Sequence, residues 1–258
     1  EKGNMKNVLG VDMPVEFPKN PDIVLENDGR YTIKECVDKI LNYKAETSID
    51  FNRDTDYWNK YYENRQDIVI PSLFAVEIGK QLNKSGSLLD LGCGNGRDSI
   101  YLYKLGLNVT AVDASDFVIK MLQEKYNDGN ICFICDDFVC SSMIYTGQYD
   151  YCYSRFSLHA INEEQEDQVI ANVYRVLKPG GKFFVEVRSI NDDLYGKGEN
   201  VGNDSYIYNG HFRRFIKCEI LEKKMVNIGF KIEYSREQKG FAPLGDSDPP
   251  IIRMILLK

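Results

Sequence analysis

The sequence predicts an α/β protein with a doubly wound sheet of seven strands, most of them parallel. Short apolar runs alternate with helix-patterned segments from residue 72 to residue 236, and a glycine-rich turn directly follows the apolar run Leu88–Leu91. A run without polar alternation is typical of a strand that is covered on both faces. A last apolar run, Ile251–Leu257, is expected to insert antiparallel at the sheet edge.

The turn after Leu91 contains Gly92, Gly94 and Gly96. Glycines two residues apart allow positive φ angles and a close approach of the backbone to a ligand, because no Cβ intervenes. Asp113 follows the next predicted strand, where a carboxylate accepts hydrogen bonds from ribose hydroxyls in nucleotide-binding units. The spacing G-x-G-x-G differs from the dinucleotide fingerprint G-x-G-x-x-G.

With Asp90, the turn reads D-L-G-C-G-x-G, which resembles motif I of the class I S-adenosylmethionine-dependent methyltransferases. L-K-P-G-G-x-F-F at 177–184 is a second similarity, which supports the fold. The resemblance implies an adenine site in which Asp137 accepts from the exocyclic amine and Phe138 packs by the ring. The alternative is that Asp137 only caps a turn. The implied cofactor contacts are Asp90, Gly92, Gly94, Gly96, Asp113, Ala114, Asp136, Asp137, Phe138 and Ser154.

Composition excludes several classes of partner. A net charge of −7 over 258 residues argues against a broad nucleic-acid surface. No apolar run approaches the roughly 20 residues of a membrane span, and the first residues lack the apolar core of a signal peptide, so we expect a cytoplasmic protein without a membrane partner. Seven cysteines suit buried, reduced thiols. For the C-x-x-C pair Cys132 and Cys135 we expect core packing, and no metal site.

Residues 1–45 form a separate unit in this interpretation, a Pro-rich strap followed by one helix, and residues 46–258 form the methyltransferase-like domain. The helix is predicted over Thr32–Tyr43, with Thr32 and Glu35 as a capping box, and a polar linker over 45–56 follows. The order of residues in the first 43 resembles the C-terminal segment of adenylylsulfate kinases. This resemblance implies an upstream kinase domain in a bifunctional fusion; the alternative is an unrelated strap.

Tyr57, Trp58, Tyr61 and Tyr62 cluster on one face of a predicted helix. Y-W-x-x-Y-Y before the first strand resembles the lid helix of the thiopurine and tellurite branch of the methyltransferases. This similarity implies that Tyr57, Trp58 and Tyr61 cover the cofactor. The alternative is that the stripe serves core packing alone.

The exit of the fourth predicted strand, SRFSLHAINEEQ, places Arg155 and His159 at the carboxyl edge, where open parallel sheets bind ligands. His159 is one of only two histidines in the chain. We interpret it as a catalytic candidate and Arg155 as a substrate contact. A satisfied structural histidine is the alternative.

The segment 188–216 is predicted to be a long irregular loop that caps the acceptor. Guanidinium forks match phosphate or carboxylate oxygens, which indicates an anionic substrate. His211 is the second catalytic candidate. A surface cluster paired with local Asp and Glu is the alternative. The expected substrate contacts of this loop are Arg188, Tyr206, Tyr208, His211, Arg213 and Arg214.

Together these features predict methyl transfer from S-adenosylmethionine, with S-adenosylhomocysteine as product, to a small anionic acceptor that is phosphorylated or nucleotide-activated. Capsule or O-antigen modification is the setting that the kinase-like strap suggests. A base is needed only if the acceptor must lose a proton, and His159 or His211 would then supply it. The alternatives are a detoxifying methyltransferase for thiols, tellurite or thiopurines, and a non-catalytic cofactor-binding partner domain of a kinase.

Overall fold

A computed structural model describes residues 32–37, 51–126 except 64–69, and 129–258. The chain divides into two units, 1–50 and 51–258. In the first unit, a helical turn at 33–37 follows Thr32, whose N–H donates to a Glu35 carboxylate oxygen at 2.6 Å, while the Glu35 N–H donates to Thr32 Oγ1 at 3.2 Å. The predicted capping box is therefore present. The Pro-rich strap and the rest of the predicted helix lie outside the described residues.

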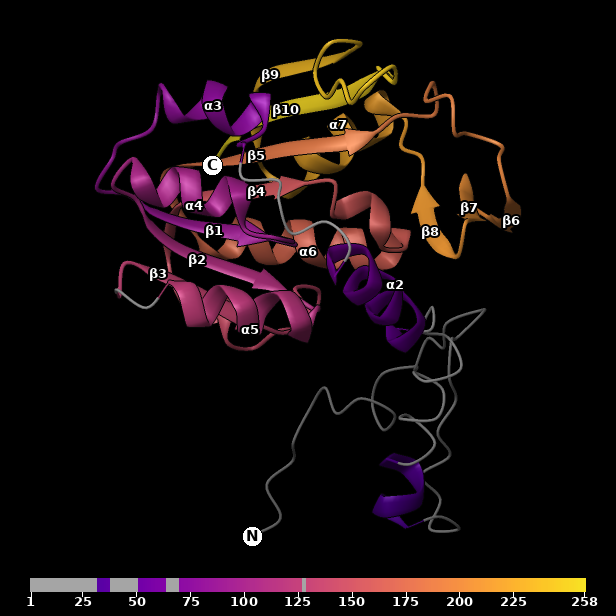
Figure 1. The fold of residues 1–258 in the computed structure, drawn as a ribbon, viewed down its shortest axis with the longest axis horizontal. Coiled ribbons are helices and arrows are strands. Elements are labelled where there is room, and N and C mark those ends of the chain that lie inside the picture. The colour runs from indigo at the N-terminus through magenta and orange to yellow at the C-terminus, as the bar shows by residue number, and fades with distance from the viewer. Residues whose placement is uncertain (1–31, 38–50, 64–69, 127–128) are drawn as a thin grey trace, which may run out of the picture. The chain divides into compact units, whose positions relative to one another are not determined.

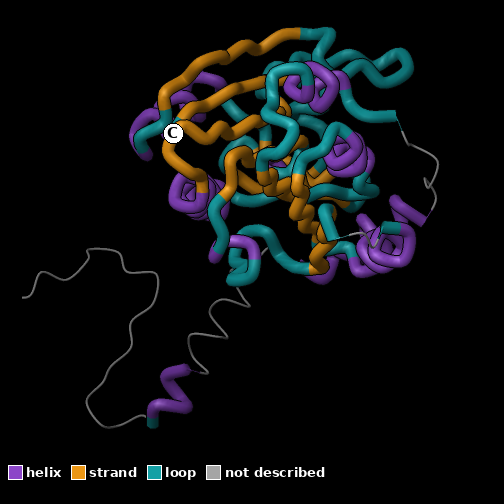
Figure 2. The backbone as a smooth tube through the Cα atoms, turned by 90° about the vertical axis from the view of Figure 1, so that its left-hand side faces the viewer, coloured by secondary structure: helices purple, strands orange, loops and turns teal. Residues whose placement is uncertain are grey.

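The second unit is built on a seven-stranded sheet in the order β3-β2-β1-β4-β5-β10-β9 (Figures 1 and 2). β10 runs antiparallel between β5 and β9, so β9 forms the edge, where we had expected the last strand. The bounds are β1 Ser87–Leu91, β2 Asn108–Asp113, β3 Ile131–Cys135, β4 Tyr149–Arg155, β5 Leu177–Arg188, β9 Lys231–Gln238 and β10 Ile251–Leu257.

Helices cover both faces of this sheet, and each face has its own apolar core. The first face carries α3, α4 and α5, through residues such as Phe74, Leu102 and Leu122. The second face carries α6 and α7, through residues such as Val173 and Leu221. The predicted doubly wound α/β fold is therefore confirmed. The helix bounds are α2 Phe51–Glu63, α3 Leu73–Gly79, α4 Arg97–Lys104, α5 Asp116–Lys125, α6 Glu163–Val176 and α7 Cys218–Ile228.

The segment after β5 differs from the predicted irregular loop, because it contains a three-stranded antiparallel sheet: β6 (Glu199–Gly202), β7 (Ser205–Tyr208) and β8 (His211–Arg214). Its strands are only four residues long, too short to show an alternating pattern in the sequence. Tight turns join them at Asn203, Asp204 and Asn209, all with positive φ. The rings of Tyr195, Tyr206 and Phe215 pack together beside it.

Two helices also begin earlier in the structure than the sequence predicted. α2 begins at Phe51, inside the stretch that we predicted as linker. α6 begins six residues before the predicted Val169, because Asn162 and Gln165 form a capping box. Two turns of 3₁₀-helix, η1 (Ile144–Thr146) and η2 (Leu158–Ala160), flank β4. In the part of the chain that the structure describes, no helix is both long and apolar enough to cross a membrane.

The prediction of cysteines packed in the core is wrong for the C-x-x-C pair. Cys132 and Cys135 are both exposed on β3, and Cys140 beyond it is exposed as well. β3 forms the other edge of the sheet and is only partly covered, with the burial of its residues alternating. The expectation of full burial assumed a strand in the interior of the sheet.

Candidate functional site

The glycine turn connects β1 to α4 with three left-handed residues. φ is 77° at Gly92, 54° at Gly94 and 73° at Gly96. The N–H groups of Gly92 and Cys93 both donate to the Val112 carbonyl, at 2.9 and 3.0 Å, which fixes the turn against the end of β2. The turn therefore lies at the carboxyl edge of the sheet, as predicted.

Asp113, at the end of β2, faces this turn. One carboxylate oxygen accepts the Gly94 N–H at 2.8 Å and the other accepts the Ser115 N–H at 3.0 Å, beside Ala114. Burial raises the pKa of Asp113, and these backbone hydrogen bonds oppose the rise. An ionised carboxylate has about four acceptor positions, so the two bonds leave capacity for ribose hydroxyls.

Asp90, on β1, lies beneath the glycine turn and connects the strand to α4. Its carboxylate is buried and accepts the Ser99 hydroxyl of α4 at 2.5 Å, which ties β1 to the helix after the turn. Burial raises the pKa of Asp90 to about 7. The side chain thus shapes the turn from within the core.

The three predicted adenine contacts after β3 have different surroundings in the structure. The Asp137 carboxylate accepts the Val139 N–H at 2.8 Å and the Cys140 thiol at 3.5 Å, so it caps the turn after β3, and its contact with adenine stays a prediction. Asp136 accepts the Asp137 N–H at 2.8 Å. Phe138 borders the glycine turn: its ring lies 3.7 Å from an ideal Cβ placed on Gly92.

The exit of β4 also packs on the turn. The hydroxyls of Ser154 and Ser157 lie 2.6 Å apart, and both residues are buried. A Cβ on Gly92 would lie 2.6 Å from the Ser157 Cβ. Gly92 is therefore required by Ser157 as well as by its positive φ.

Helix α2 crosses the carboxyl edge of the sheet (Figure 1). Asn59 donates to Asp116 at 3.1 Å and accepts the Ser115 hydroxyl at 2.5 Å, which fixes the helix to the start of α5. Farther along, the Tyr62 hydroxyl oxygen would lie 2.2 Å from a Cβ on Gly94. The aromatic helix thus closes directly over the glycine turn.

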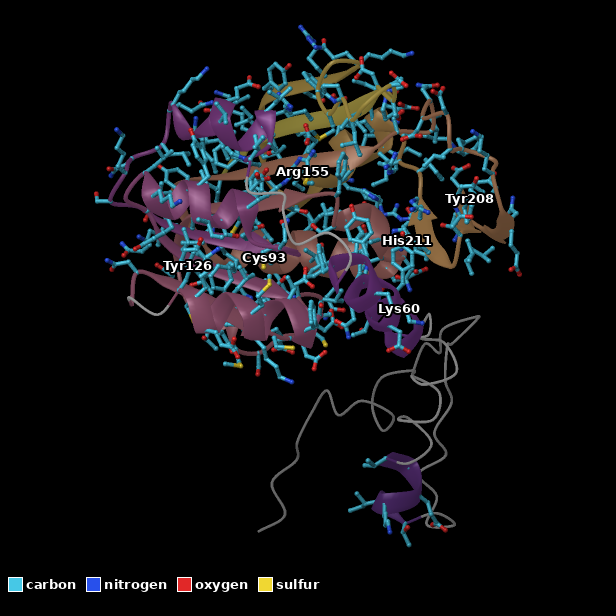
Figure 3. All side chains as sticks on the ribbon, viewed as in Figure 1. Lys60, Cys93, Tyr126, Arg155, Tyr208 and His211 are labelled. Atoms are coloured by element: carbon cyan, nitrogen blue, oxygen red, sulfur yellow. The ribbon has the colours of Figure 1, made fainter. Side chains whose placement is uncertain are left out.

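The same helix meets β8 through an imidazole. The ring of Tyr57 is stacked on His211 and Trp58 meets it edge-on, both at 4.8 Å between centroids. Tyr61 packs against both aromatic neighbours. Figure 3 shows His211 beside α2. Helix α2 therefore packs over both the glycine turn and the hairpin of β7 and β8.

The two histidines lie in one buried cluster. His159 and His211 are only 3% and 2% exposed, and Nδ1 of each has no hydrogen-bond partner among the described residues. Burial, followed by the positive charges of Arg188, Arg213 and Arg214, lowers the pKa of His159 well below its usual range. Burial, with Arg213 and Arg188, lowers the pKa of His211 to about 3. Both imidazoles are therefore neutral near pH 7.

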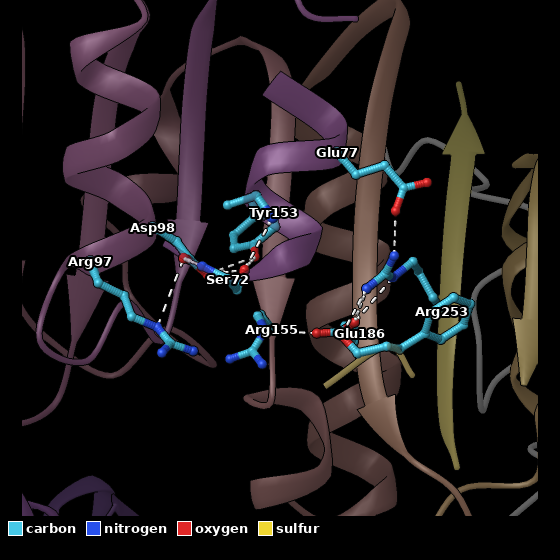
Figure 4. A network of polar contacts seen from close by, with 10 residues as sticks. Ser72, Glu77, Arg97, Asp98, Tyr153, Arg155, Glu186 and Arg253 are labelled. Atoms are coloured by element: carbon cyan, nitrogen blue, oxygen red, sulfur yellow. Dashed lines mark hydrogen bonds and ion pairs between the residues drawn. The ribbon is translucent and has the colours of Figure 1, made fainter. Parts of the chain in front are cut away.

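Three predicted arginines surround this cluster. Arg213 is half-buried and donates to the Tyr208 and His211 carbonyls at 3.1 and 3.5 Å, and among the described residues it forms no ion pair with a carboxylate. Burial and the charge of Arg188 lower the pKa of Arg213. Arg188 pairs with Asp192 at 2.5 Å. Arg155 pairs with Glu186 at 2.7 Å in a buried network that continues to Arg253 (Figure 4).

Arg214, a predicted substrate contact, binds other groups of the protein through its guanidinium. It is buried, forms an ion pair with Glu166 at 2.5 Å and donates to the Leu158 and Ile161 carbonyls. Its guanidinium thus holds the segment around His159 in place. This arrangement also differs from the surface-cluster alternative, because Arg214 is buried and Glu166 lies on α6 rather than nearby in the sequence.

The tyrosines of β7 also differ from each other. Tyr206 is buried in the ring cluster with Tyr195 and Phe215, which is a packing role. Tyr208 lies opposite His211 in the hairpin and is 36% exposed.

Sequence reasoning missed two residues. Tyr62 was recognised in the aromatic stripe but not as the residue on the turn. Phe156 has a φ of 60°, rare for a non-glycine residue, and its ring lies 5.5 Å from that of His159. Its only signal in the sequence was its place between Arg155 and Ser157 at a strand exit.

Comparison with known proteins finds similarity to methyltransferases. Residues 88–181 match a family described as methyltransferase domain. The chain is 30% identical over 146 residues to phosphoethanolamine N-methyltransferase 1 of Triticum aestivum, which covers 50% of this chain and 29% of that protein. It is 29% identical over 107 residues to a probable S-adenosyl-L-methionine-dependent methyltransferase, TehB, of Haemophilus influenzae, which covers 42% of this chain and 37% of that protein. The matched segments thus span well under half of these relatives.

A solved structure supports the same fold over more of the chain. The 1,6-didemethyltoxoflavin-N1-methyltransferase of Burkholderia thailandensis, with bound S-adenosylhomocysteine, aligns with a TM-score of 0.60 at 18% identity, covering 81% of this chain and 87% of that one. The sheet therefore has the Rossmann-like fold of this solved methyltransferase, and residues 88–181 are similar to the methyltransferase-domain family.

Proposed function

We propose that this methyltransferase domain transfers the methyl group of S-adenosylmethionine to a small anionic acceptor, phosphorylated or nucleotide-activated. One arrangement carries the proposal. Helix α2 covers both the glycine turn, at Gly94, and the buried cluster of neutral imidazoles and arginines, at His211. A cofactor site and an acceptor site under one cover suit a transfer that needs alignment and exclusion of water.

The residues around the turn fit the cofactor. Asp113 retains acceptor positions for ribose hydroxyls, the backbone at Gly92 and Gly94 admits a close approach, and Phe138 borders the turn. The sulfonium of S-adenosylmethionine supplies an already activated methyl group. In this proposal Ser154, Asp136 and Ala114 line the same edge, and Tyr57, Trp58 and Tyr61 close it.

The acceptor side favours an anion. Arg213 forms no ion pair among the described residues, and burial strengthens its interaction with any oxyanion that replaces water. The wheat relative is named for a phosphorylated amine, which makes phosphoethanolamine the first acceptor to try. A phosphorylated precursor of a capsule or O-antigen, supplied by an upstream kinase domain of the same polypeptide, belongs to the same class.

A proton, where the acceptor carries one, has a defined destination. Nδ1 of His159 or His211 is unpartnered among the described residues and both imidazoles are neutral, but their lowered pKa makes them weak bases, so this route suits an acceptor whose proton is acidic. An acceptor that is already an anionic oxygen needs neither.

The second candidate is a detoxifying methyltransferase for thiols, tellurite or thiopurines. The aromatic face of α2 and the similarity to TehB favour it, whereas the arginines disfavour apolar acceptors. A non-catalytic partner domain would keep the cofactor site alone.

Calorimetry with S-adenosylhomocysteine tests the cofactor site. We expect wild-type protein to bind, Asp113→Ala to lose binding, and the exposed control Asp246→Ala to match wild type. Absence of binding by wild type would remove both enzyme candidates.

A methyl-release assay over phosphoethanolamine, phosphorylated sugars, nucleotides and thiols, with products identified by mass, tests the acceptor. We expect turnover of a phosphorylated compound, reduced by Arg213→Ala and unchanged by Arg236→Ala, an exposed arginine on β9. Turnover of thiols alone would select the second candidate.

A further inference from the structure

We propose that Phe156 is a positioning residue that holds two guanidinium groups at the acceptor side without adding a negative charge there. The inference rests on the proposed anionic acceptor. Phe156 occupies the left-handed region, with φ of 60°, directly after β4, and its N–H donates to the Glu186 carbonyl at 2.8 Å. Strain of this kind persists only where the surroundings fix it, and it concentrates at functional sites.

Two cations lie over the Phe156 ring. The guanidinium carbon of Arg155 is 4.3 Å from the ring centroid and that of Arg188 is 5.5 Å away. Both distances fall within the range in which the negative face of an aromatic ring attracts a cation. One neutral side chain thus holds two like charges near each other.

Each guanidinium has a second anchor, which uses only part of its fork. Glu186 accepts from Nε of Arg155, and Asp192 accepts from one terminal nitrogen of Arg188. A guanidinium has five N–H donors, so these bonds leave donors for an oxyanion. Glu186 and Asp192 already supply one carboxylate to each arginine. A carboxylate at position 156 would add a further negative charge, which would repel an incoming anion. The ring attracts both guanidinium groups without adding that charge.

The ring also reaches the histidine cluster. His159 meets Phe156 edge-on, at 69° between planes, and is itself nearly fully buried. Phe156 therefore sets the position of Arg155 and Arg188 relative to the unpartnered Nδ1 of His159. This places the anion-binding donors and a proton acceptor in one fixed group.

Three variants test the role, each measured by calorimetry with inorganic phosphate, phosphoethanolamine and S-adenosylhomocysteine. Phe156→Tyr keeps the ring and is expected to match wild type. Phe156→Leu removes the ring face and is expected to weaken binding of phosphate or phosphoethanolamine about tenfold. Phe156→Asp keeps an attraction for both arginines and is expected to lose anion binding. All three are expected to bind S-adenosylhomocysteine within about twofold of wild type.

A spectroscopic readout separates positioning from folding. The Nε–H proton of Arg155 lies near a ring current, so its NMR resonance should move on Phe156→Leu and stay close to wild type on Phe156→Tyr. The inference is overturned if Phe156→Leu binds the anions like wild type, or if it loses S-adenosylhomocysteine equally, which would indicate a structural role. Wild-type protein that binds S-adenosylhomocysteine but neither anion overturns the inference alone; wild type that binds none of the three overturns the proposed function as well.

Discussion

The ring of Tyr57 lies nearly parallel to the imidazole of His211, with 10° between their planes and 4.8 Å between their centroids. Trp58 meets the same imidazole edge-on. Tyr57 and Trp58 belong to α2, and His211 opens β8, so a single buried imidazole joins the cover of the glycine turn to the acceptor-side hairpin. Movement of α2 away from the turn must break this contact.

His211→Ala is therefore expected to loosen α2. Trp58 is the only tryptophan in the chain, so its fluorescence reports on this helix alone. We expect a red-shifted emission and stronger quenching by acrylamide, because Trp58 loses an aromatic neighbour and gains water. His211→Phe, which keeps a ring at this position, is the matched control and should resemble wild type. Emission and quenching that are unchanged in His211→Ala would show that the stack does not hold the helix.

The low pKa of His211 predicts a loss of stability in acid. The folded-state pKa is about 3, whereas an exposed histidine titrates near 6.5, so below pH 6.5 the unfolded state binds a proton that the folded state does not. Stability that is complete above pH 6.5 is then lost as pH falls toward 3, by about 2 kcal/mol at pH 5. Urea denaturation at pH 7.5, 6 and 5 measures it.

His211→Gln is the control for this pH dependence, because glutamine does not titrate. Asp90 acts with the opposite sign: its pKa is raised to about 7, so its protonation stabilises the folded state as pH falls. The difference between wild type and His211→Gln removes this shared contribution. Equal losses in both proteins between pH 7.5 and 5 would contradict the assignment.

The parts of the fold that could be predicted are those in which the local sequence pattern directly reflects the burial or backbone conformation of the same residues. Leu88, Leu89 and Leu91 are apolar and fully buried because β1 is covered on both faces, and Asp90 is the one polar residue among them. The positive φ of Gly94 could be predicted from the residue type alone, because glycine adopts such angles without steric cost. The exposed Cys132 was misjudged because its burial depends on β3 being an edge strand, which is a property of strand order.

The acceptor side shows the limit more clearly. Arg213 and Arg214 are adjacent and chemically identical, yet side chains alternate across a strand. Arg213 lies with His211 on the face toward α2, whereas Arg214 pairs with Glu166. Telling them apart required β8, whose four residues carry no detectable period. Phe156 was invisible for the same reason, since its role depends on the ring's neighbours.

Glu186 is expected to be the most sensitive carboxylate of the sheet. It is fully buried and accepts from Arg155 at 2.7 Å and from Arg253 at 2.7 and 3.0 Å. Glu186→Gln leaves buried Arg155 without a carboxylate partner and leaves Arg253 with Glu77 alone, which should lower the free energy of unfolding by about 3–5 kcal/mol. The control is Glu233→Gln, which breaks the partly exposed pair with Lys182 and should cost at most about 1 kcal/mol. Comparable urea midpoints for the two variants would refute this ranking.

Gly94→Ala should disturb the turn through Tyr62. A Cβ at Gly94 would lie 2.2 Å from the Tyr62 hydroxyl oxygen and 3.0 Å from the ring carbon that bears it. Gly180→Ala is the matched control, because Gly180 also has positive φ, 79°, but nothing within 4 Å of an added Cβ. Both substitutions carry a backbone cost of about 1–2 kcal/mol. Only Gly94→Ala should weaken the binding of S-adenosylhomocysteine, by about tenfold or more, measured by calorimetry.

The double variant Gly94→Ala, Tyr62→Phe separates the contact with Tyr62 from a direct effect on the cofactor. Removing the hydroxyl relieves the closest approach, so the cost of Gly94→Ala should be smaller in the Tyr62→Phe background, for stability and for binding. Additive losses would mean that Tyr62 moves aside without cost, and that the defect arises where the added methyl group meets the cofactor. A recovery of stability without a recovery of binding would assign the two effects to different neighbours of the same Cβ: Tyr62 for folding, and the cofactor for binding.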